Sequence, residues 1–246
     1  MKILVCLSKV PDTTTRIAFI DNNTKFDEKD VQFIINPYDE WYALVRGLEL
    51  KEANTGTVTT ITVGGADTDP IIRKALAIGA DDAVRIDSPA SDAYSTAFQI
   101  AEYAKDKAFD MILLGKETID YNGSQIGGMV AEMLDLPFIS LASKLDIAGG
   151  KATIECDIPG GTQVLEVEGA FVLSAAKGMA EQRIPNMRGI MAARSKPLNV
   201  IPAVAVEPLT KTESYQLPPA KAGVKLVDPD NMAELVRLLH EEAKAI

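Results

Sequence analysis

Short apolar runs alternate with helical patterns along the first half of the chain. The runs at residues 3–7, 58–63, 83–86 and 111–114 have the length and composition of buried strands. Between them, and after the last one, apolar residues recur at spacings of three and four, as in helices that bury one face. This alternation predicts an α/β fold, in which helices cover a parallel sheet.

Polar residues mark where the helices begin. Asn36 is a good N-cap for a helix in which Pro37 takes the first position and Asp39 lies three residues after the cap. Asp92 caps a later helix in the same way. The polar segment at residues 12–30 lies between the first strand and the first helix, and we expect it to hold a hairpin.

The pattern changes after Pro137. Residues 154–158 and 164–167 alternate apolar and polar positions on either side of a Pro-Gly-Gly turn, which predicts a β-hairpin. Residues 170–173 form one more apolar run and are expected to be a strand. The sheet domain therefore gains a β-hairpin extension.

In the last part of the chain, before the terminal helix, apolar residues do not recur at a regular helical or strand spacing. Residues 202–219 are rich in Pro, Thr and Ser, so they predict an extended arm. The arm ends in a helix that Asp228 caps and Pro229 opens, with a stripe of apolar residues at Met232, Leu235, Val236 and Leu239. We divide the chain into an α/β domain over residues 1–200 and an arm with its helix over residues 201–246, which is expected to dock on a partner subunit.

Residues 115–126 join a buried strand to a helix through small polar residues. The unpaired amides at such a helix start favour an anion, and Gly123 lets the main chain approach it closely. Ser124 either caps the helix or holds a phosphate. The stretch alone is equally compatible with a Ser-capped turn that binds nothing.

Other strand ends converge on this turn. In parallel α/β sheets, ligands bind beyond the carboxyl ends of the strands, where the connections diverge to opposite faces. Cys6, Val63 and Gly115 stand at three such ends, and the turn at Asn36 supplies a fourth wall. Taken singly, the alternatives are a buried cysteine, a glycine turn and a helix cap, but their coincidence favours a nucleotide site.

Composition argues against several classes of partner and site. A formal net charge of −10 argues against a nucleic-acid partner, and no apolar run reaches the ~18 residues that cross a bilayer. Cys6 and Cys156 are too few for a disulfide framework or a zinc site, which favours a reducing, cytoplasmic location. His240 is the only histidine, so histidine triads and His-rich metal sites are excluded, and we expect binding rather than catalysis.

A basic stretch interrupts this acidic protein. It contains one acid, Glu181, among five cations at Lys177, Arg183, Arg188, Arg194 and Lys196. Three methionines, whose side chains adapt to several partners, lie in the same stretch at Met179, Met187 and Met191. The stretch suits docking of an acidic partner. A solvated loop with buried methionines is the alternative.

The motifs together resemble one family along nearly the whole chain. They are residues 9–12 (Lys-Val-Pro-Asp), 36–39 (Asn-Pro-Tyr-Asp), 75–81 (Ala-Leu-Ala-Ile-Gly-Ala-Asp) and 114–116 (Leu-Gly-Lys) with the Ile-Asp pair at 119–120. In this order they resemble the β subunit of electron transfer flavoprotein. The resemblance implies an adenine-nucleotide-binding, doubly wound, Rossmann-like domain that pairs with an α subunit.

The resemblance also implies how electrons pass. FAD lies in a shared site held mainly by the α subunit, takes electrons from acyl-CoA or other dehydrogenases and passes them onward to a quinone oxidoreductase. The β subunit itself would be an electron carrier subunit without catalytic residues, and neither a metal nor direct membrane insertion is implied.

Two sets of residues match the family's binding positions. The positions that would hold AMP structurally are Cys6, Asn36, Pro37, Tyr38, Asp39, Val63, Gly115, Asp120, Asn122, Gly123, Ser124, Gln125 and Ile126. The positions in the loop at residues 183–192 that would dock dehydrogenases are Arg183, Met187, Arg188, Ile190 and Met191, with Met187 as the apolar anchor.

The chain departs from the family pattern at some positions. Cys156 stands where the family signature has a basic residue, Pro159 where it has an acid, and Gly169 where it has a proline. Residues 121–124 match neither the usual AMP loop nor the loop of electron-bifurcating relatives, which place FAD in that site. A single phosphate suits Gly123 and Ser124, so we favour AMP.

Two other classes share this fold. An adenylating enzyme usually carries a Ser-Gly-Gly-x-Asp-Ser run after its first strand, where this chain has Leu-Ser-Lys-Val-Pro-Asp at residues 7–12. A nucleotide-binding stress-type module would work without an α subunit, whereas the arm and terminal helix favour a partner.

Overall fold

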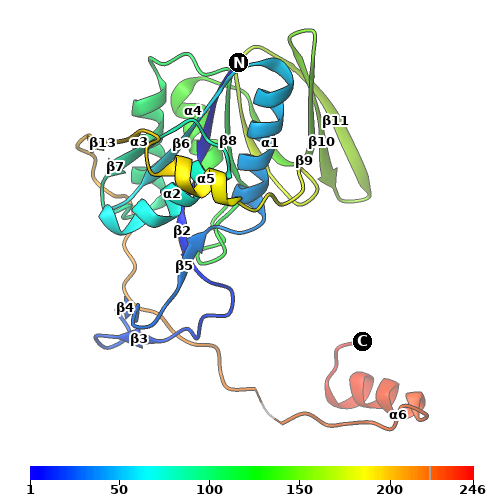
Figure 1. Cartoon of the computed structure of the whole chain (residues 1–246). Coiled ribbons are helices and arrows are strands. Elements are labelled where there is room, and N and C mark those ends of the chain that lie inside the picture. Colours follow the sequence, from blue (N-terminus) through cyan, green and yellow to red (C-terminus); the bar gives the residue numbers. More distant parts are fainter. Residues whose placement is uncertain (222) are drawn as a thin grey trace.

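The structure, a computed structural model, describes residues 1–221 and 223–246, and its main feature is a nine-stranded sheet within those residues. The strands lie in the order β11-β10-β9-β12-β8-β1-β6-β7-β13 (Figure 1). Their bounds are β1 Lys2–Cys6, β6 Thr57–Val63, β7 Asp82–Asp87, β8 Met111–Gly115, β9 Phe138–Ala148, β10 Lys151–Ile158, β11 Gly161–Glu168, β12 Phe171–Ala175 and β13 Leu198–Pro202. All neighbouring pairs from β9 to β13 in this order are parallel, which confirms the predicted parallel sheet.

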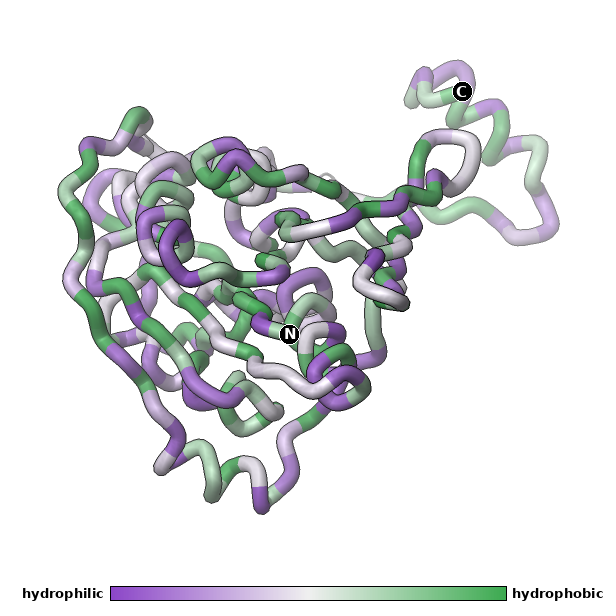
Figure 2. Tube along the Cα trace, turned by 90° about the horizontal axis from the view of Figure 1, so that it is seen from above, coloured by the Kyte–Doolittle hydropathy of each residue, from purple (hydrophilic) through white to green (hydrophobic). Residues whose placement is uncertain are grey.

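Helices cover both faces of the sheet. The α-helices are α1 Asp39–Asn54, α2 Asp69–Ile78, α3 Ala93–Ala104, α4 Ile126–Leu134, α5 Met187–Ala193 and α6 Met232–Arg237. A short 3₁₀ helix, η1 Ala66–Thr68, precedes α2, and a π-helical segment, η2 Leu238–Glu242, follows α6. Successive residues of β1 point to opposite faces, so Val5 packs into the core under α1 and α2 while Leu4 packs under α3 and α4. Figure 2 shows the same layers from above, coloured by hydropathy.

Of the helix N-caps predicted at Asn36, Asp92 and Asp228, only the one at Asp92 is confirmed. Asp92 caps α3, because its carboxylate accepts the Ser95 amide at 2.8 Å in a capping box, as predicted. The predicted cap at Asn36 is wrong, because α1 begins at Asp39 after Tyr38. The predicted cap at Asp228 is also wrong, since Asn231 caps α6. In both wrong cases the expected start lies a few residues before the observed one.

Small antiparallel units flank the sheet. β3 Phe19–Ile20 pairs with β4 Lys25–Phe26, so the hairpin expected in residues 12–30 is present. β2 Lys9–Pro11 pairs with β5 Phe33–Ile35. The β10–β11 hairpin is confirmed, and it turns at Gly160 with a positive φ of 88° that favours glycine. The sequence did not predict β9, which joins that hairpin to the parallel sheet.

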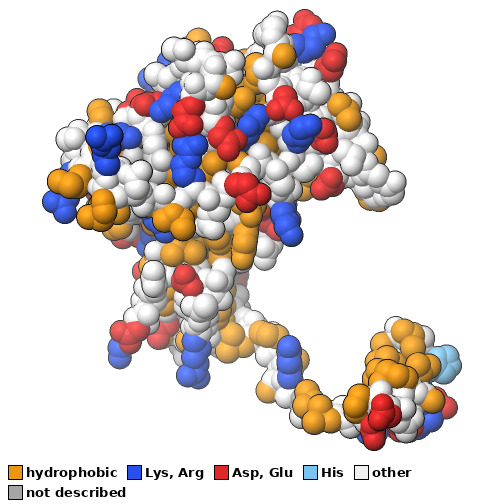
Figure 3. Space-filling model, turned by 45° about the vertical axis from the view of Figure 1, so that its right-hand side comes forward, with side chains coloured by type: hydrophobic (Ala, Val, Ile, Leu, Met, Phe, Trp, Pro, Cys, Tyr) orange, Lys and Arg blue, Asp and Glu red, His pale blue; other side chains and the backbone are white. Residues whose placement is uncertain are grey.

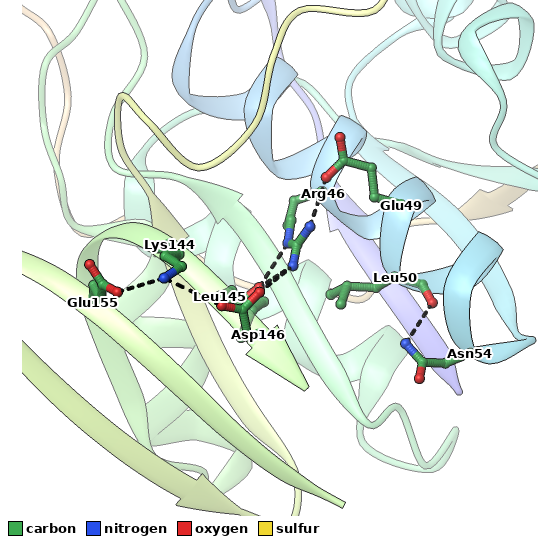
Figure 4. Close-up of polar contacts among 8 residues, drawn as sticks. All are labelled: Arg46, Glu49, Leu50, Asn54, Lys144, Leu145, Asp146 and Glu155. Atoms are coloured by element: carbon green, nitrogen blue, oxygen red, sulfur yellow. Dashed lines mark hydrogen bonds and ion pairs between the residues drawn. The ribbon is translucent and has the colours of Figure 1, made fainter. Parts of the chain in front are cut away.

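Arg46 fastens this antiparallel extension to α1 (Figure 4). Its Nε donates to the Leu145 carbonyl on β9 at 2.8 Å, and its Nη2 lies 3.0 Å from Asp146 Oδ1. Its Nη1 donates to Glu49 Oε2 at 2.8 Å, so the guanidinium is held from both sides. The extension is therefore tied to the core of the domain.

The arm starts from β13, an edge strand that the sequence did not predict, and runs across α3 before it leaves the sheet. Gln99 on α3 donates to the Val204 carbonyl at 2.7 Å and accepts the Val204 amide at 2.9 Å. Beyond the arm, α6 stands apart from the sheet (Figure 1), and Figure 3 shows hydrophobic side chains gathered on that terminal segment. None of the described helices is both long and apolar enough to span a membrane.

Candidate functional site

The carboxyl ends of β1 and β8 form the centre of the site. These two strands are parallel neighbours, yet the chain leaves β1 through α1 on one face and reaches β8 through α3 on the other. This divergence is the topological switch point at which ligands bind in such sheets. Of the residues predicted for the site, Cys6 and Gly115 end these two strands, and Val63 ends β6 beside β1.

A buried carboxylate links α1 to the end of β1. Glu40 is 6% exposed, and its two oxygens accept the Ser8 backbone amide and the Ser8 hydroxyl, each at 2.7 Å. Burial raises the pKa of Glu40 to about 8; the Ser8 hydrogen bonds oppose this shift, and the charges of Asp120 and Asp39 add to it. The sequence analysis missed both Glu40 and Ser8. The sequence pattern that could have indicated them is a Ser directly after an apolar strand, together with an acid on the buried side of the next helix.

Cys6 lies beside this carboxylate. Burial raises the pKa of the Cys6 thiol, and the charge of Glu40 raises it further. The thiol therefore stays protonated at neutral pH, and a thiolate nucleophile is excluded at this position.

Asn36 holds the loop that follows β8. Its side chain is fully buried, donates from Nδ2 to the Glu117 carbonyl at 2.9 Å, and accepts the Ile119 amide at Oδ1 at 3.0 Å. Both partners lie more than 80 residues away in the sequence. The amide side chain that was predicted to cap a helix instead ties the 36–39 turn to the 116–125 loop.

The first turn of α1 and the end of β8 are in close contact. A Cβ on Gly115 would lie 2.8 Å from Glu40 Cγ, 2.9 Å from the Glu40 backbone nitrogen and 3.0 Å from Asp39 Cβ. Only glycine fits without displacement, so residue 115 is small for a packing reason. Burial raises the pKa of Asp39 to about 6, while Lys116 lowers it and Glu117 raises it.

Tyr38 forms the exposed side of this turn, and Pro37 before it is half-buried. Tyr38 is exposed and has a positive φ of 62° ahead of α1, which is an uncommon backbone conformation for a residue with a side chain. Such conformations gather at functional sites, although they also occur in plain turns.

The loop at residues 116–125 ends without a side-chain cap on α4. Gln125 is the N-cap residue and makes no capping hydrogen bond, while the Ser124 hydroxyl donates to Glu117 Oε2 at 3.1 Å. Of the two roles expected for Ser124, the helix cap is therefore wrong, and the phosphate contact stays a prediction. The first intrahelical amide bond in this region is from Met129 to the Gln125 carbonyl, so the amides of Ile126 and its successors face the loop.

The glycine of this loop has space around it. A Cβ on Gly123 would meet no other described atom within 4 Å, and its φ lies outside the left-handed region. Its neighbours Asn122 and Ser124 do have positive φ values, of 48° and 51°. The protein itself therefore imposes no steric requirement for glycine at position 123. Asp120 lies in the same loop, close enough for its charge to raise the pKa of Glu40.

Four residues of the second predicted set lie on α5, and the fifth, Arg183, lies before it. Met187 is 73% and Met191 68% exposed, and Ile190 is exposed as well. Asn186 caps this short helix by accepting the Gly189 amide at 2.8 Å, and the helix packs against α2. The sequence was expected to form a loop here. Arg188 is exposed on the same helix.

Several side chains of the basic stretch already have partners within the chain, so fewer of them can contact a docking protein than the composition predicts. Arg183 makes two hydrogen bonds to the Glu52 carboxylate, at 2.7 and 3.0 Å, and Lys196 donates to the Leu76 carbonyl at 2.9 Å. Met179 is buried. The carbonyl of Arg183 also accepts the Trp41 indole N–H at 3.2 Å, which joins the segment before α5 to the first turn of α1.

Metal chemistry finds no support in the described part of the chain. No group of three or more His, Cys, Asp or Glu side chains in residues 1–221 and 223–246 could hold a metal ion. The acidic side chains of this site whose pKa burial raises are the two carboxyls at the start of α1, Asp39 and Glu40.

Known proteins resemble this chain over its full length. Residues 23–206 match the family model of the electron transfer flavoprotein domain. The electron transfer flavoprotein subunit beta of Bacillus subtilis is 37% identical over all of both chains. The subunit of the same name from Syntrophomonas wolfei is 38% identical over 93% of this chain and 90% of its own. The acryloyl-CoA reductase electron transfer subunit gamma of Anaerotignum propionicum is 31% identical over 88% of this chain and 84% of its own.

Proposed function

This chain belongs to the electron transfer flavoprotein family, as a relative of its β subunits, and from that premise we propose that it binds AMP structurally and works as an electron carrier subunit. Its partner would be an α subunit that holds most of the FAD site. The observation that carries the nucleotide assignment is the α4 start, which has no side-chain cap and lies at the switch point next to the open Gly123.

Charge favours the start of α4 over the start of α1 for the proposed phosphate. The start of α1 carries Asp39 and Glu40, so an anion there would meet like charge once these carboxyls ionise. The first turn of α4 carries no acid, and its amides face the loop. The ribose and base would then extend towards the 36–39 turn and the end of β1, where carboxylates suit ribose hydroxyls.

The bound nucleotide would stabilise the site without reacting. It would join the 116–125 loop to the turn that Asn36 already ties to it. Ligands that bind only the folded state add to its stability. FAD would supply the redox chemistry of the assembly, and this chain would shape one wall of its site and exclude water.

The exposed face of α5 is the proposed docking surface for acyl-CoA or other dehydrogenases. Met187 and Met191 give it adaptable apolar side chains, and Arg188 adds a cation at its rim. Electrons would leave the complex for a quinone oxidoreductase by the same kind of transient contact. A cytoplasmic location fits the two cysteines, which are both unpaired and buried.

The domain division is a proposal of the same kind. The boundary at residue 200 falls inside β13, so the strand belongs to the sheet and the arm proper begins after Pro202. We propose that the arm and α6 dock on the α subunit.

The names of two relatives support a second candidate function. One relative is named as an electron transfer subunit of an acryloyl-CoA reductase, and another, 29% identical over 99% of this chain, as a subunit of a caffeyl-CoA reductase complex. The second function is an electron-bifurcating subunit with FAD in place of AMP.

The experiment is to coexpress this chain with an α subunit, purify the complex, denature it and identify the released nucleotides by mass spectrometry. One FAD and one AMP per heterodimer supports the simple carrier. Two FAD would replace it with the bifurcating subunit. A chain that purifies alone, without flavin and with bound nucleotide, would favour the stress-type module and overturn the proposal.

A further inference from the structure

Asp92 holds a helix and the arm with one carboxylate. Its Oδ1 accepts the Ser95 amide at 2.8 Å and so caps α3. Its Oδ2 accepts the Leu209 amide at 2.7 Å and the Thr210 amide at 3.0 Å, both in the arm. Burial raises the pKa of Asp92, but the hydrogen bonds from these residues outweigh it and lower the pKa to about 2. The carboxylate is therefore charged at neutral pH, and its hydrogen bonds to the arm are of the stronger, charge-assisted kind.

Gln99, further along α3, fixes the arm at a second point. Its side chain is 2% exposed, donates from Nε2 to the Val204 carbonyl at 2.7 Å and accepts the Val204 amide at Oε1 at 2.9 Å. The carbonyl and the amino group of a buried side chain are thus both paired with the arm. Removal of the arm would take these partners away, and an unpaired buried amide is costly.

Tyr215 fixes the arm at a third point. Its ring stacks on Phe19 of the β3–β4 hairpin, with centroids 4.7 Å apart and an interplanar angle of 8°. Its backbone amide donates to the Asn23 carbonyl in the turn of that hairpin at 2.7 Å. Figure 1 shows the arm passing beside β3 and β4 before it continues to α6. The arm is therefore held first against α3 and then against the hairpin.

Beyond Tyr215 the chain leaves the domain. Residues 216–221 and 223–226 are exposed. Within the described residues after Tyr215, hydrogen bonds run only to other residues of the same terminal part. The three points therefore divide the arm into an anchored root, residues 203–215, and a tether that leads to α6, whose described residues are 216–221 and 223–231.

We propose that Asp92, Gln99 and Tyr215 are positioning residues for partner docking, because they hold the anchored root and so present α6 on a short tether from one fixed place on the domain. The inference rests on the proposed function, in which α6 docks on the α subunit. It deepens that function by naming the residues of this chain that set where the helix can dock and how tightly.

The length of the tether gives the size of the effect. The effective concentration of a tethered group falls roughly as the −3/2 power of the tether length. Release of the anchored root would lengthen the tether from residues 216–231 to residues 203–231. The effective concentration of α6 at the partner would then fall roughly 2- to 3-fold.

The variants separate the arm contact of Asp92 from its helix cap. Asparagine is as good an N-cap as aspartate but has one acceptor oxygen, so Asp92→Asn keeps the Ser95 amide and turns an NH2 group towards the arm amides. Gln99→Leu removes both bonds to Val204 and keeps an apolar volume, and Tyr215→Ala removes the stacked ring. A combined variant carries all three changes. Ser95→Ala loses the Ser95 hydroxyl from the capping box but none of the bonds to the arm, so it is the matched control.

Two measurements are made on each variant. Amide hydrogen exchange over residues 203–215 is followed by mass spectrometry in the full chain before the α subunit is added. This range contains the amides of Val204, Leu209, Thr210 and Tyr215, which all donate at the three points. The Kd of the heterodimer is then measured with a fluorescently labelled α subunit.

The combined variant is expected to speed exchange at these amides roughly 10-fold or more and to raise the Kd at least roughly 2- to 3-fold. Asp92→Asn alone is expected to speed exchange at residues 209–210, and Ser95→Ala to change neither quantity. Unchanged exchange in the combined variant would overturn the anchored root, and faster exchange with an unchanged Kd would overturn its role in docking. A wild-type chain that binds no α subunit would overturn the proposed partner and with it the docking role, while the exchange data decide separately on the anchored root.

Discussion

Glu40 and Ser8 form a buried junction between the first turn of α1 and the end of β1. The carboxylate of Glu40 accepts both the amide and the hydroxyl of Ser8, each at 2.7 Å, with 6% of Glu40 exposed. A carboxyl that is removed from water favours its neutral form, and here two hydrogen bonds only partly offset that cost. The Glu40 carboxyl of the folded chain therefore holds a proton near neutral pH.

The first prediction concerns the pH dependence of stability. The pKa of Glu40 rises from 4.5 to about 8 on folding, so between these values the folded chain holds a proton that the unfolded chain releases. The free energy of unfolding therefore falls as the pH rises through this window, by at most ~1.4 kcal/mol per pH unit for one proton. Glu40→Gln, whose amide can still pair with Ser8, is expected to remove this part of the slope in thermal melts.

The control for this prediction is Glu132→Gln, because Glu132 is an exposed carboxylate on α4. It is expected to leave the slope of the wild type unchanged. Identical slopes for Glu40→Gln and the wild type would mean that Glu40 does not hold the proton.

The second prediction separates packing from ligand binding at two glycines. A Cβ at position 115 overlaps the backbone of Glu40, so Gly115→Ala is expected to cost about 1–3 kcal/mol in the free energy of unfolding. A Cβ at position 123 meets no described atom within 4 Å, so Gly123→Ala is expected to leave the stability of the nucleotide-free protein nearly unchanged. The measurements are denaturant unfolding without nucleotide and calorimetric titration with AMP.

The two variants then differ in what they do to the ligand. If a phosphate lies against the main chain of the loop, Gly123→Ala weakens AMP binding despite its normal stability. Normal AMP affinity in Gly123→Ala would place the phosphate elsewhere.

The alternation of strands and helices was predictable because each element carries its own periodicity. The apolar run at residues 111–114 and the Asp92 cap are local signals, and β8 and α3 follow them. Strand β13 was missed because Leu198–Pro202 is a half-exposed edge strand with no continuous apolar run. Helix α5 was missed because its seven residues are too few for a clear period.

The sequence predicted which strand ends and turns come together, but not the contacts between them; that a nucleotide binds there stays a prediction. Strand ends and a glycine loop indicate where a ligand binds, since they depend on chain order alone. The roles of Asn36 and Glu40 depend on partners 81 and 32 residues away, to which no local pattern points. A polar residue before a helix resembles a cap from its sequence, and only the fold shows that Asn36 instead holds a distant loop.

The third prediction tests that contact. Asn36→Ala leaves the Glu117 carbonyl and the Ile119 amide without their side-chain partner in a buried place, which is expected to cost about 2–3 kcal/mol of unfolding free energy. Because the same loop is proposed to hold the phosphate, AMP affinity should fall as well. Denaturant unfolding and calorimetry measure the two effects. Asn54→Ala, which loses one bond to the Leu50 carbonyl at the end of α1, is the matched control and should keep its affinity.

The fourth prediction concerns the terminal helix. Met232, Leu235 and Val236 are exposed at spacings of three and four on α6, so they form one apolar face. The double variant Met232→Ser with Val236→Ser is expected to reduce the amount of α subunit that copurifies, because less apolar surface is buried on association. Ala233→Ser, an exposed position between them in sequence, is the control. Undiminished copurification of the double variant would show that α6 does not dock on the partner.

The last prediction concerns docking of dehydrogenases through α5. Met187 is the most exposed methionine of this helix, and truncation of an apolar anchor at an interface typically costs more than 1 kcal/mol. Met187→Ala is therefore expected to raise the apparent KM for the purified heterodimer as electron acceptor of an acyl-CoA dehydrogenase by roughly 5- to 30-fold. Flavin content should stay unchanged, because α5 packs against α2. Val164→Ala, at an exposed apolar position on β11, is the control and should behave as the wild type. Equal loss of flavin and of electron transfer in Met187→Ala would assign this residue to the flavin site instead of the docking surface.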